Sequence, residues 1–219
     1  MLDLFCGTKS VAHAFTREGF DVTTLDNDLQ FAPDIWTDIL DWNYKELKSF
    51  DVSWADVIWT SPPCEGFSVA AISKNWIQRN GCLIPISQKA EHSIKLVQRT
   101  IKIIEYISPK YWFIENPVGA LRKQEFMQGL PRKTITYCQY GDIRMKPTDI
   151  WGNFPEDFPI RKCSPNDKCH EASPRGSRTG TQGLKGSIER GRIPAEFCSL
   201  LAEHIKQEIR PTNMAISTI

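Results

Sequence analysis

Residues 57–69 read VIWTSPPCEGFSV, and this stretch joins an apolar run to a rigid turn. Val57, Ile58 and Trp59 are typical of a buried strand, and the two prolines that follow cannot continue one. Cys64 comes directly after these prolines, where the chain is expected to leave the core. A cysteine is more often a small buried residue, but the fixed Pro-Pro turn would hold this thiol in a single geometry. We therefore interpret Cys64 as a candidate nucleophile.

Strand-like and helix-like segments alternate around this stretch. The expected strands are residues 1–5, 21–26, 55–61, 111–116 and 133–140. Apolar residues recur every three or four positions in the expected helices, which are residues 10–19, 88–107 and 192–209. This alternation predicts an α/β fold, with a parallel sheet covered by helices on both faces.

Chemically useful residues follow several of the expected strands. Ligands of parallel sheets bind at the carboxyl ends of the strands, where the chain offers Cys6-Gly7, Asp26, Cys64 and Glu115. Asp26 lies 19 residues after Gly7, which is the spacing of an acid that holds a ribose. Glu115 ends an apolar strand, and a carboxyl group in such surroundings can have a raised pKa and act as an acid. The sequence thus predicts a nucleotide-like ligand and a reactive centre at one edge of the sheet.

Three motifs in this order resemble those of the DNA cytosine-C5 methyltransferases. They are LDLFCG at 2–7, SPPCEGFS at 61–68 and FIENP at 113–117. The resemblance extends over about residues 2–150 and over the helix RIPAEFCSLLAEHI. Methyltransferases that act on amino groups carry an aromatic residue after the two prolines, whereas Cys64 stands there in this chain.

The resemblance implies a Rossmann-like fold with a small, irregular, basic DNA-recognition insert. It implies S-adenosylmethionine as methyl donor and S-adenosylhomocysteine as product. Catalytic roles fall on Cys64, Glu115 and either Arg144 or Lys146. The implied cofactor-binding residues are Phe5, Cys6, Gly7, Thr8, Asp26, Asn27, Asp38, Ile39, Ser61 and Pro62. Contacts to the substrate are expected from Pro63, Ser68, Asn116, Arg175 and Arg178.

The chain departs from the family pattern near both expected sites. Lys9 stands where further glycine is usual, and Glu65 replaces the glutamine after the nucleophile. Thr148 replaces the second arginine of a motif that supplies a contact to the cytosine O2. Arg144 and Lys146 both remain candidates for that contact.

Charge is distributed unevenly along the 219 residues. The net charge is only +1, but residues 161–192 carry eight Lys/Arg and three Asp/Glu, which gives +5. We expect a catalytic domain at 1–151, a basic insert at 152–192 that meets DNA, and a C-terminal helical segment at 193–219. An insert this short reads few base edges, so short or relaxed sequence specificity is expected.

The seven cysteines are scattered and are interpreted as reduced thiols. The absence of a signal peptide and of a long apolar run predicts a cytoplasmic protein, and a monomer is expected. Cys163, Cys169 and His170 have the residue types of a zinc site, but a fourth ligand is missing from the pattern. No metal is therefore expected from the sequence.

The predicted reaction is methylation of C5 in a cytosine that is flipped out of double-stranded DNA, through a covalent bond from Cys64 to C6. Compact chains of this kind resemble those of bacteriophages and of restriction-modification systems. Two alternatives remain open, namely an RNA cytosine-C5 methyltransferase and a non-catalytic regulatory or DNA-binding relative. A transfer from a charged cofactor variant, admitted by Lys9 or Arg192, is the least favoured hypothesis.

Overall fold

The computed structural model describes residues 1–49, 55–171 and 186–209, and its centre is a seven-stranded sheet. The strand order is β3-β2-β1-β4-β7-β9-β8. All neighbouring pairs from β3 to β7 are parallel, and β9 is antiparallel to both β7 and β8. The strands are β1 (Leu2–Leu4), β2 (Thr23–Asp26), β3 (Ile35–Trp36), β4 (Val57–Thr60), β7 (Tyr111–Pro117), β8 (Arg132–Thr136) and β9 (Pro147–Gly152).

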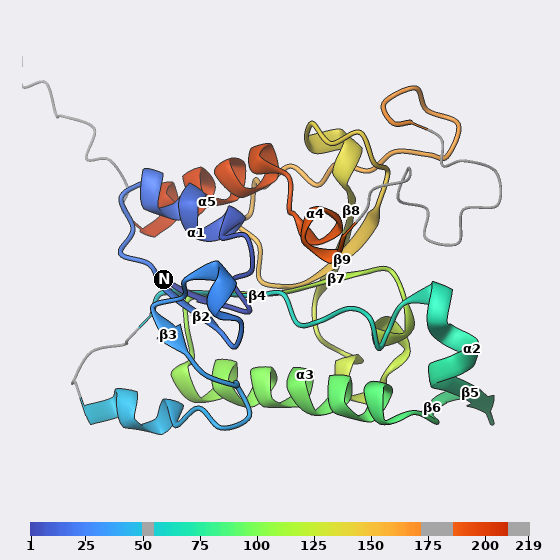
Figure 1. Ribbon diagram of the computed structural model, residues 1–219. Helices are drawn as coiled ribbons and strands as arrows, with labels where there is room; N and C mark the ends of the chain where they lie inside the picture. Colours follow the sequence, from blue (N-terminus) through green and yellow to red (C-terminus); the bar gives the residue numbers. More distant parts are fainter. Residues whose placement is uncertain (50–54, 172–185, 210–219) are drawn as a thin grey trace, which may run out of the picture.

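Helices cover both faces of this sheet. In Figure 1, α3 (Gln88–Ile107) lies along one face, and α1 (Ser10–Arg17) and α5 (Ala195–Ile209) lie together on the other. A small hairpin of β5 (Trp76–Arg79) and β6 (Cys82–Pro85) follows the short helix α2 (Ile72–Asn75), and α4 (Ser187–Gly191) precedes α5. The 3-10 turns are η1 (Leu29–Phe31), η2 (Tyr44–Ser49), η3 (Val69–Ala71), η4 (Ala120–Lys123), η5 (Glu125–Met127) and η6 (Tyr137–Tyr140). None of the helices in the described ranges is long and apolar enough to cross a membrane.

Two hydrophobic cores fill the spaces between the sheet and its helices. Alternate side chains of a strand point to opposite faces, so Ile58 packs on the α3 side while Val57 and Trp59 pack on the α1–α5 side. The same alternation puts Leu2 and Leu4 in the α3 core. Burial on both faces explains why the strands read as nearly continuous apolar runs.

The α/β prediction is confirmed, but both edges of the sheet differ from expectation, since β3 was not predicted and the last two strands are antiparallel. The strand expected at 133–140 ends at Thr136, and its last four residues form η6 instead. The strand β9 was not predicted, because Pro147, Thr148 and Asp149 give it a polar beginning. The hairpin of β5 and β6 also escaped prediction, although its Asn80-Gly81 turn is a recognised hairpin signal.

Part of the predicted insert packs against the catalytic domain. Phe158 is 6% exposed, and its ring lies 5.7 Å from that of Phe197 in α5. Phe154 contacts Phe113 of β7 in an edge-to-face arrangement with centroids 5.2 Å apart. The start of the irregular segment is therefore anchored to the α5 side of the core. Arg175 and Arg178, which were expected to contact the substrate, lie outside the described residues.

A buried ion pair joins η4 to β9. The carboxylate of Asp149 is fully buried, and it accepts hydrogen bonds from Arg122 Nε at 2.8 Å and from Thr134 Oγ1 at 2.7 Å. A second guanidinium nitrogen of Arg122 completes a bidentate pair with this carboxylate. Arg132 of β8 is a second, more distant cation, with its Nε 3.9 Å from the same carboxylate. The antiparallel edge of the sheet thus contains one buried negative charge whose closest partner is Arg122.

Arg122→Ala is expected to lower the free energy of unfolding by roughly 3 kcal/mol, because it removes the bidentate partner of a buried carboxylate and leaves only the more distant Arg132 as counter-charge. Chemical denaturation followed by circular dichroism measures this change. The matched control is Lys123→Ala, at the exposed neighbouring position, which should change stability by less than about 0.5 kcal/mol. Equal effects of the two substitutions would contradict the assigned role of the ion pair.

Candidate active site

The candidate site lies between β1 and β4, where successive strands begin to be added on the opposite side of the sheet. β1 and β4 are parallel neighbours, but the chain continues from β1 through α1 to β2 and from β4 through α3 to β7, on opposite sides. Such a switch point leaves a crevice at the carboxyl ends of the two strands. A cleft of about 1210 Å³ occupies this place, and its lining includes Cys6, Asp26, Cys64 and Lys146.

The loop after β1 has an unusual backbone. Phe5, Gly7 and Lys9 have positive φ angles of 57°, 45° and 56°, and residues other than glycine rarely adopt this conformation. Lys9 thus takes a left-handed conformation at a position where the family usually has glycine, and its ammonium group donates to the carbonyl of Ala32. Strained backbone of this kind is often found at ligand sites.

Asp26 braces this loop from the end of β2. Its carboxylate accepts a hydrogen bond from the backbone N–H of Gly7 at 2.9 Å and another from that of Asp28 at 3.0 Å. An ionised carboxylate can accept about four hydrogen bonds, so acceptor capacity remains for a ligand. Asp26 also lines the cleft, together with Cys6, Thr8 and the exposed Asn27.

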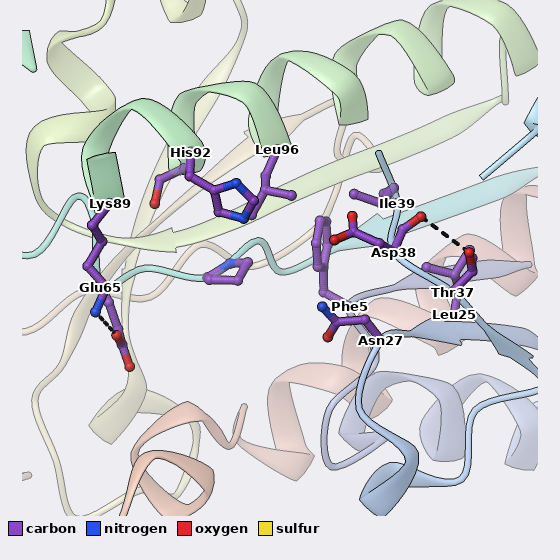
Figure 2. Close-up of a pocket in the computed structure, with 12 residues that line it drawn as sticks. Phe5, Leu25, Asn27, Thr37, Asp38, Ile39, Glu65, Lys89, His92 and Leu96 are labelled. Carbon is purple, nitrogen blue, oxygen red and sulfur yellow. Dashed lines mark hydrogen bonds and ion pairs between the residues drawn. The ribbon is translucent and has the colours of Figure 1, made fainter. Parts of the chain in front are cut away.

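A smaller cavity of about 140 Å³ adjoins the cleft, and both share Phe5 and Asn27. Figure 2 shows Phe5, Asp38, Ile39 and Leu96 gathered around it. One oxygen of Asp38 accepts the backbone N–H of Leu40 at 2.8 Å, which fixes the carboxylate beside the apolar lining. A flat apolar slot with one fixed acid suits a heteroaromatic base.

Sequence analysis missed Asp3, in the middle of β1. Asp3 is 1% exposed and lines the cleft, and its Oδ2 atom has no hydrogen-bond partner among the described residues. Burial raises the pKa of this carboxyl group to about 7. A ligand group that donates a hydrogen bond to this oxygen would be favourable, because leaving a buried polar atom unpaired costs free energy. An acid inside the apolar run MLDLF is the signal that could have identified it.

The turn that carries Cys64 is fixed from several directions. Asn116, at the end of β7, donates from Nδ2 to the buried carbonyl of Pro62 at 3.0 Å. A Cβ atom on Gly66 would lie 2.2 Å from Ser93 Oγ of α3, so only glycine allows this close approach. Pro62 is buried under the turn, whereas Pro63 and Ser68 line the cleft as expected for substrate contacts.

Three ionisable groups interact electrostatically at this turn. Burial raises the pKa of the Cys64 thiol, Glu115 raises it further, and Lys146 lowers it. Burial likewise raises the pKa of Glu115, against the opposing effect of Lys146. The pKa of Lys146 is lowered by burial and raised by both partners. The cation therefore favours the ionised form of each neighbour.

Glu115 is 6% exposed and is held by hydrogen bonds. Tyr137 OH donates to its Oε1 at 2.9 Å, and Ser61, which accepts from the Trp59 indole at 2.8 Å, contributes a further hydrogen bond that lowers its pKa. Tyr137 was missed from the sequence because its segment was assigned to a strand. Its position over Glu115 depends on η6, which no local pattern indicates.

Arg144 and Lys146, the two candidates for the contact to the cytosine O2, occupy different environments. The guanidinium of Arg144 is 3% exposed, pairs with Asp142 and donates to the carbonyls of Glu189, Arg190 and Arg192. Lys146 lines the cleft, and its Nζ donates to the Arg190 carbonyl at 2.9 Å. Thr148 is fully buried and donates to the carbonyl of Lys146 at 3.1 Å. Arg144 joins two segments of the chain, whereas Lys146 is next to Glu115 and Cys64.

Glu65 is paired away from the thiol. It forms an exposed ion pair with Lys89 of α3, shown at one end of the group in Figure 2. Among the groups that raise the pKa of Cys64, Glu65 has a smaller effect than Glu115. The departure from the family pattern next to the nucleophile is therefore electrostatically minor.

The rate of alkylation at Cys64 tests these couplings. At pH 8, Glu115→Gln should increase the rate, because removal of the negative charge lowers the pKa of the thiol and increases its thiolate fraction. Lys146→Met should decrease it, and each change should be about threefold, the effect of half a pKa unit. Glu65→Gln should have a smaller effect than Glu115→Gln. Peptide mass spectrometry measures the rate, with the exposed Cys82 as internal reference, and the opposite order of the variants would contradict the assignment.

Comparisons with known proteins agree with this geometry. A family model for C-5 cytosine-specific DNA methylases matches residues 1–136. A protein of Frog virus 3 (isolate Goorha), named "Probable DNA (cytosine-5)-methyltransferase", is 34% identical over 220 residues, which covers 92% of this chain and 98% of the viral protein.

Two solved structures share the fold. One is a prophage-encoded protein of E. coli described as a DNA modification methyltransferase, with a TM-score of 0.51 and 18% identity over 74% of this chain. The other is the methyltransferase EhMeth of Entamoeba histolytica, with a TM-score of 0.50 and 13% identity over 74% of this chain. This chain spans 50% and 56% of their lengths. With the family match over residues 1–136 and the viral relative along nearly all of its length, the chain belongs to the C-5 cytosine-specific DNA methylase family.

Proposed function

We propose that this protein transfers a methyl group from S-adenosylmethionine to C5 of a flipped-out cytosine in DNA, through a covalent bond between Cys64 and C6. The family supports DNA cytosine methylation as the reaction class. The observation that carries the specific proposal is the electrostatic coupling of Cys64 to Glu115 and Lys146 at the edge of the cleft.

The lining of the cleft fits S-adenosylmethionine. The unpaired Oδ2 of Asp3 would accept a hydrogen bond from the ammonium of its methionine part, beside Cys6 and Gly7. Asp26 retains acceptor capacity for the ribose hydroxyls, with Asn27 beside it. Asp38 and the apolar wall of the smaller cavity suit the adenine. When bound, the cofactor supplies an electrophilic methyl group on a sulfonium.

Cys64 and Glu115 would act on the cytosine from two sides. Attack of the thiolate on C6, with donation of the Glu115 proton to N3, makes C5 electron-rich enough to accept a methyl group. Burial raises the pKa of Glu115, which favours the protonated form needed for this donation. Loss of the C5 proton to solvent, departure of the thiolate and return of the N3 proton to Glu115 then restore the aromatic ring. Stacking and base pairing cover C6 and N3 of the cytosine inside a duplex, so the base must leave the stack.

Lys146 is the proposed contact to the cytosine O2 and stabilises negative charge on the thiolate. Its ammonium lines the cleft, and its pKa is coupled to those of Cys64 and Glu115. Arg144 has a positioning role instead, because its guanidinium is engaged by Asp142 and three backbone carbonyls. The basic segment after Glu171 is proposed to meet the DNA phosphates, including through Arg175 and Arg178.

Trapping with a fluorinated base tests the covalent step. A pool of duplexes of varied sequence that contain 5-fluorocytosine should form a denaturation-resistant adduct in the presence of S-adenosylmethionine, because the C5 fluorine cannot leave as a proton does. Denaturing electrophoresis and peptide mass spectrometry should locate the bond at Cys64. Cys64→Ala should abolish the adduct, whereas the control Cys82→Ser, at an exposed position of the hairpin, should retain it.

Matched RNA distinguishes the alternatives. An adduct with RNA alone would favour the RNA methyltransferase. Absence of any adduct, although calorimetry detects binding of S-adenosylmethionine, would favour the non-catalytic relative. Either result would overturn the proposed reaction.

Substitution of the two basic residues should separate catalysis from stability. Lys146→Met should reduce kcat by about 100-fold or more, the usual effect of removing one charge-stabilising donor, with little change in the unfolding midpoint. Arg144→Met should lower the free energy of unfolding by about 2–3 kcal/mol, because it removes the guanidinium partner of the Asp142 carboxylate and the donor to the carbonyls of Glu189 and Arg192. Methyl transfer and denaturation are measured on the same preparations. A large loss of stability in Lys146→Met with kcat unchanged would reverse the assignment.

A further inference from the structure

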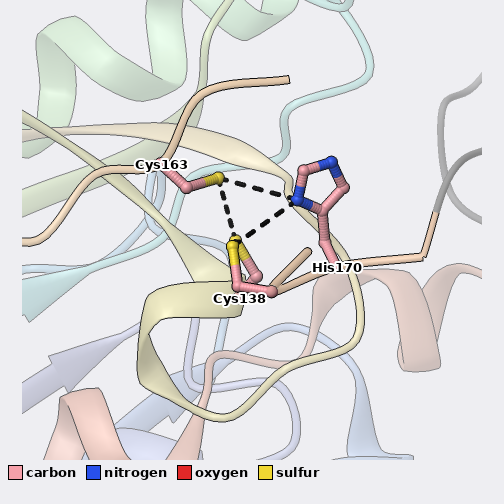
Figure 3. Close-up of side chains that lie close together, drawn as sticks. Cys138, Cys163 and His170 are labelled. Carbon is pink, nitrogen blue, oxygen red and sulfur yellow. Dashed lines mark hydrogen bonds between the residues drawn. The ribbon is translucent and has the colours of Figure 1, made fainter. Parts of the chain in front are cut away.

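Three cysteines and one histidine meet on the antiparallel side of the sheet. Cys138 belongs to η6, and Cys163, Cys169 and His170 follow in the irregular segment after β9. Their sulfur atoms and one imidazole nitrogen all lie within 4.8 Å of one another. Figure 3 shows Cys138, Cys163 and His170 converging on one point. No metal site was predicted from the sequence because a fourth ligand was missing from the pattern, and the fold brings Cys138 to that place.

Three of the distances between these atoms match those of a tetrahedral site. The Cys169 and Cys138 sulfurs are 3.6 Å apart, and His170 Nδ1 lies 3.7 Å from the sulfurs of Cys163 and Cys169. Zinc with bonds of about 2.3 Å to sulfur and about 2.0 Å to nitrogen sets S···S distances of about 3.8 Å and S···N distances of about 3.6 Å. The Cys138 and Cys163 sulfurs are 3.1 Å apart, which is shorter than the zinc-set S···S distance but much longer than the bond of about 2.05 Å in a disulfide.

Hydrogen bonds outside the cluster hold its ligands in place. The backbone N–H of Cys163 donates to Thr136 Oγ1, at the end of β8, at 2.8 Å. Ser164 and Asp167 form a turn between the second and third ligands, in which the N–H of Ser164 donates to the Asp167 carboxylate at 2.7 Å. The N–H of Glu171 donates to the Ile143 carbonyl at 2.9 Å. The backbone on both sides of the ligands is thus tied to the sheet and to the loop after η6.

We propose that Cys138, Cys163, Cys169 and His170 bind one zinc ion as a structural site. Three thiolates and one imidazole are soft ligands that favour zinc over magnesium or calcium, and four protein ligands close the coordination sphere. The site is separate from the proposed catalytic groups, and the methyl-transfer chemistry does not require it.

The zinc would fix one wall of the cleft. His170 and Glu171 line the cleft opposite the loop after β1, and the basic residues 172–185 follow directly in the sequence. Residues 153–171 form no helix or strand, so their backbone has few regular hydrogen bonds. A bound metal can restrain the conformation of such a segment. Zinc binding would thereby position the start of the basic segment relative to the substrate.

Metal analysis of the full chain tests this proposal. The protein, purified without a histidine tag in reducing buffer and reconstituted with zinc, should contain about one zinc per chain by atomic emission. Cys169→Ser and His170→Ala should lose nearly all of it. Both side chains are at least partly exposed, so circular dichroism should show that these variants still fold. The matched control Cys82→Ser should retain the full zinc content.

Cobalt substitution provides a second readout. Co²⁺ in the native chain should give the intense visible bands of a tetrahedral site together with thiolate charge-transfer absorption, and Cys138→Ser should lose both. Less than about one-tenth of a zinc per chain after reconstitution would overturn the proposal. So would unchanged zinc in the ligand variants, or a Cys138–Cys163 disulfide found by mass spectrometry in the reduced preparation.

Discussion

The pairing of β4 between β1 and β7 is the constraint on which the site depends. These three strands are parallel, so their carboxyl ends must reach the same edge of the sheet. The glycine loop, the Cys64 turn and the Glu115 carboxyl group thereby converge from segments more than fifty residues apart. One hydrogen bond, from Asn116 to the carbonyl of Pro62, fixes the last two relative to each other.

Burial determines the electrostatics of the reacting centre. Both the Cys64 thiol and the Glu115 carboxyl group have raised pKa values because water is removed from around them. For Glu115 this effect suits a proton donor, whereas for Cys64 it opposes formation of the nucleophilic thiolate. Lys146 offsets part of the penalty for the thiol. The positive charge of Lys146 thus lies beside two acidic groups, Cys64 and Glu115, and favours the ionised form of both.

The departures from the family pattern have local structural explanations. Lys9 adopts the left-handed conformation usual for glycine, and Glu65 pairs with Lys89 at the surface. Arg144 connects its loop to the segment before α5, through the carbonyls of Glu189, Arg190 and Arg192. Together with the proposed zinc site, this connection gives the short irregular segment a fixed attachment to the sheet.

The sequence by itself determined four of the parallel strands and the three main helices, and it indicated Cys64, Asp26 and Glu115 as candidate site residues. These features follow from local periodicity and from residues at strand ends, which a chain carries in its order alone. Only the tertiary structure placed Lys146, rather than Arg144, beside Cys64 and Glu115, showed the unpaired oxygen of Asp3, and brought Cys138 to Cys163, Cys169 and His170. Each of these depends on contacts between distant segments and on burial, because desolvation and distance, rather than residue type, decide what an ionisable group or a thiol can do.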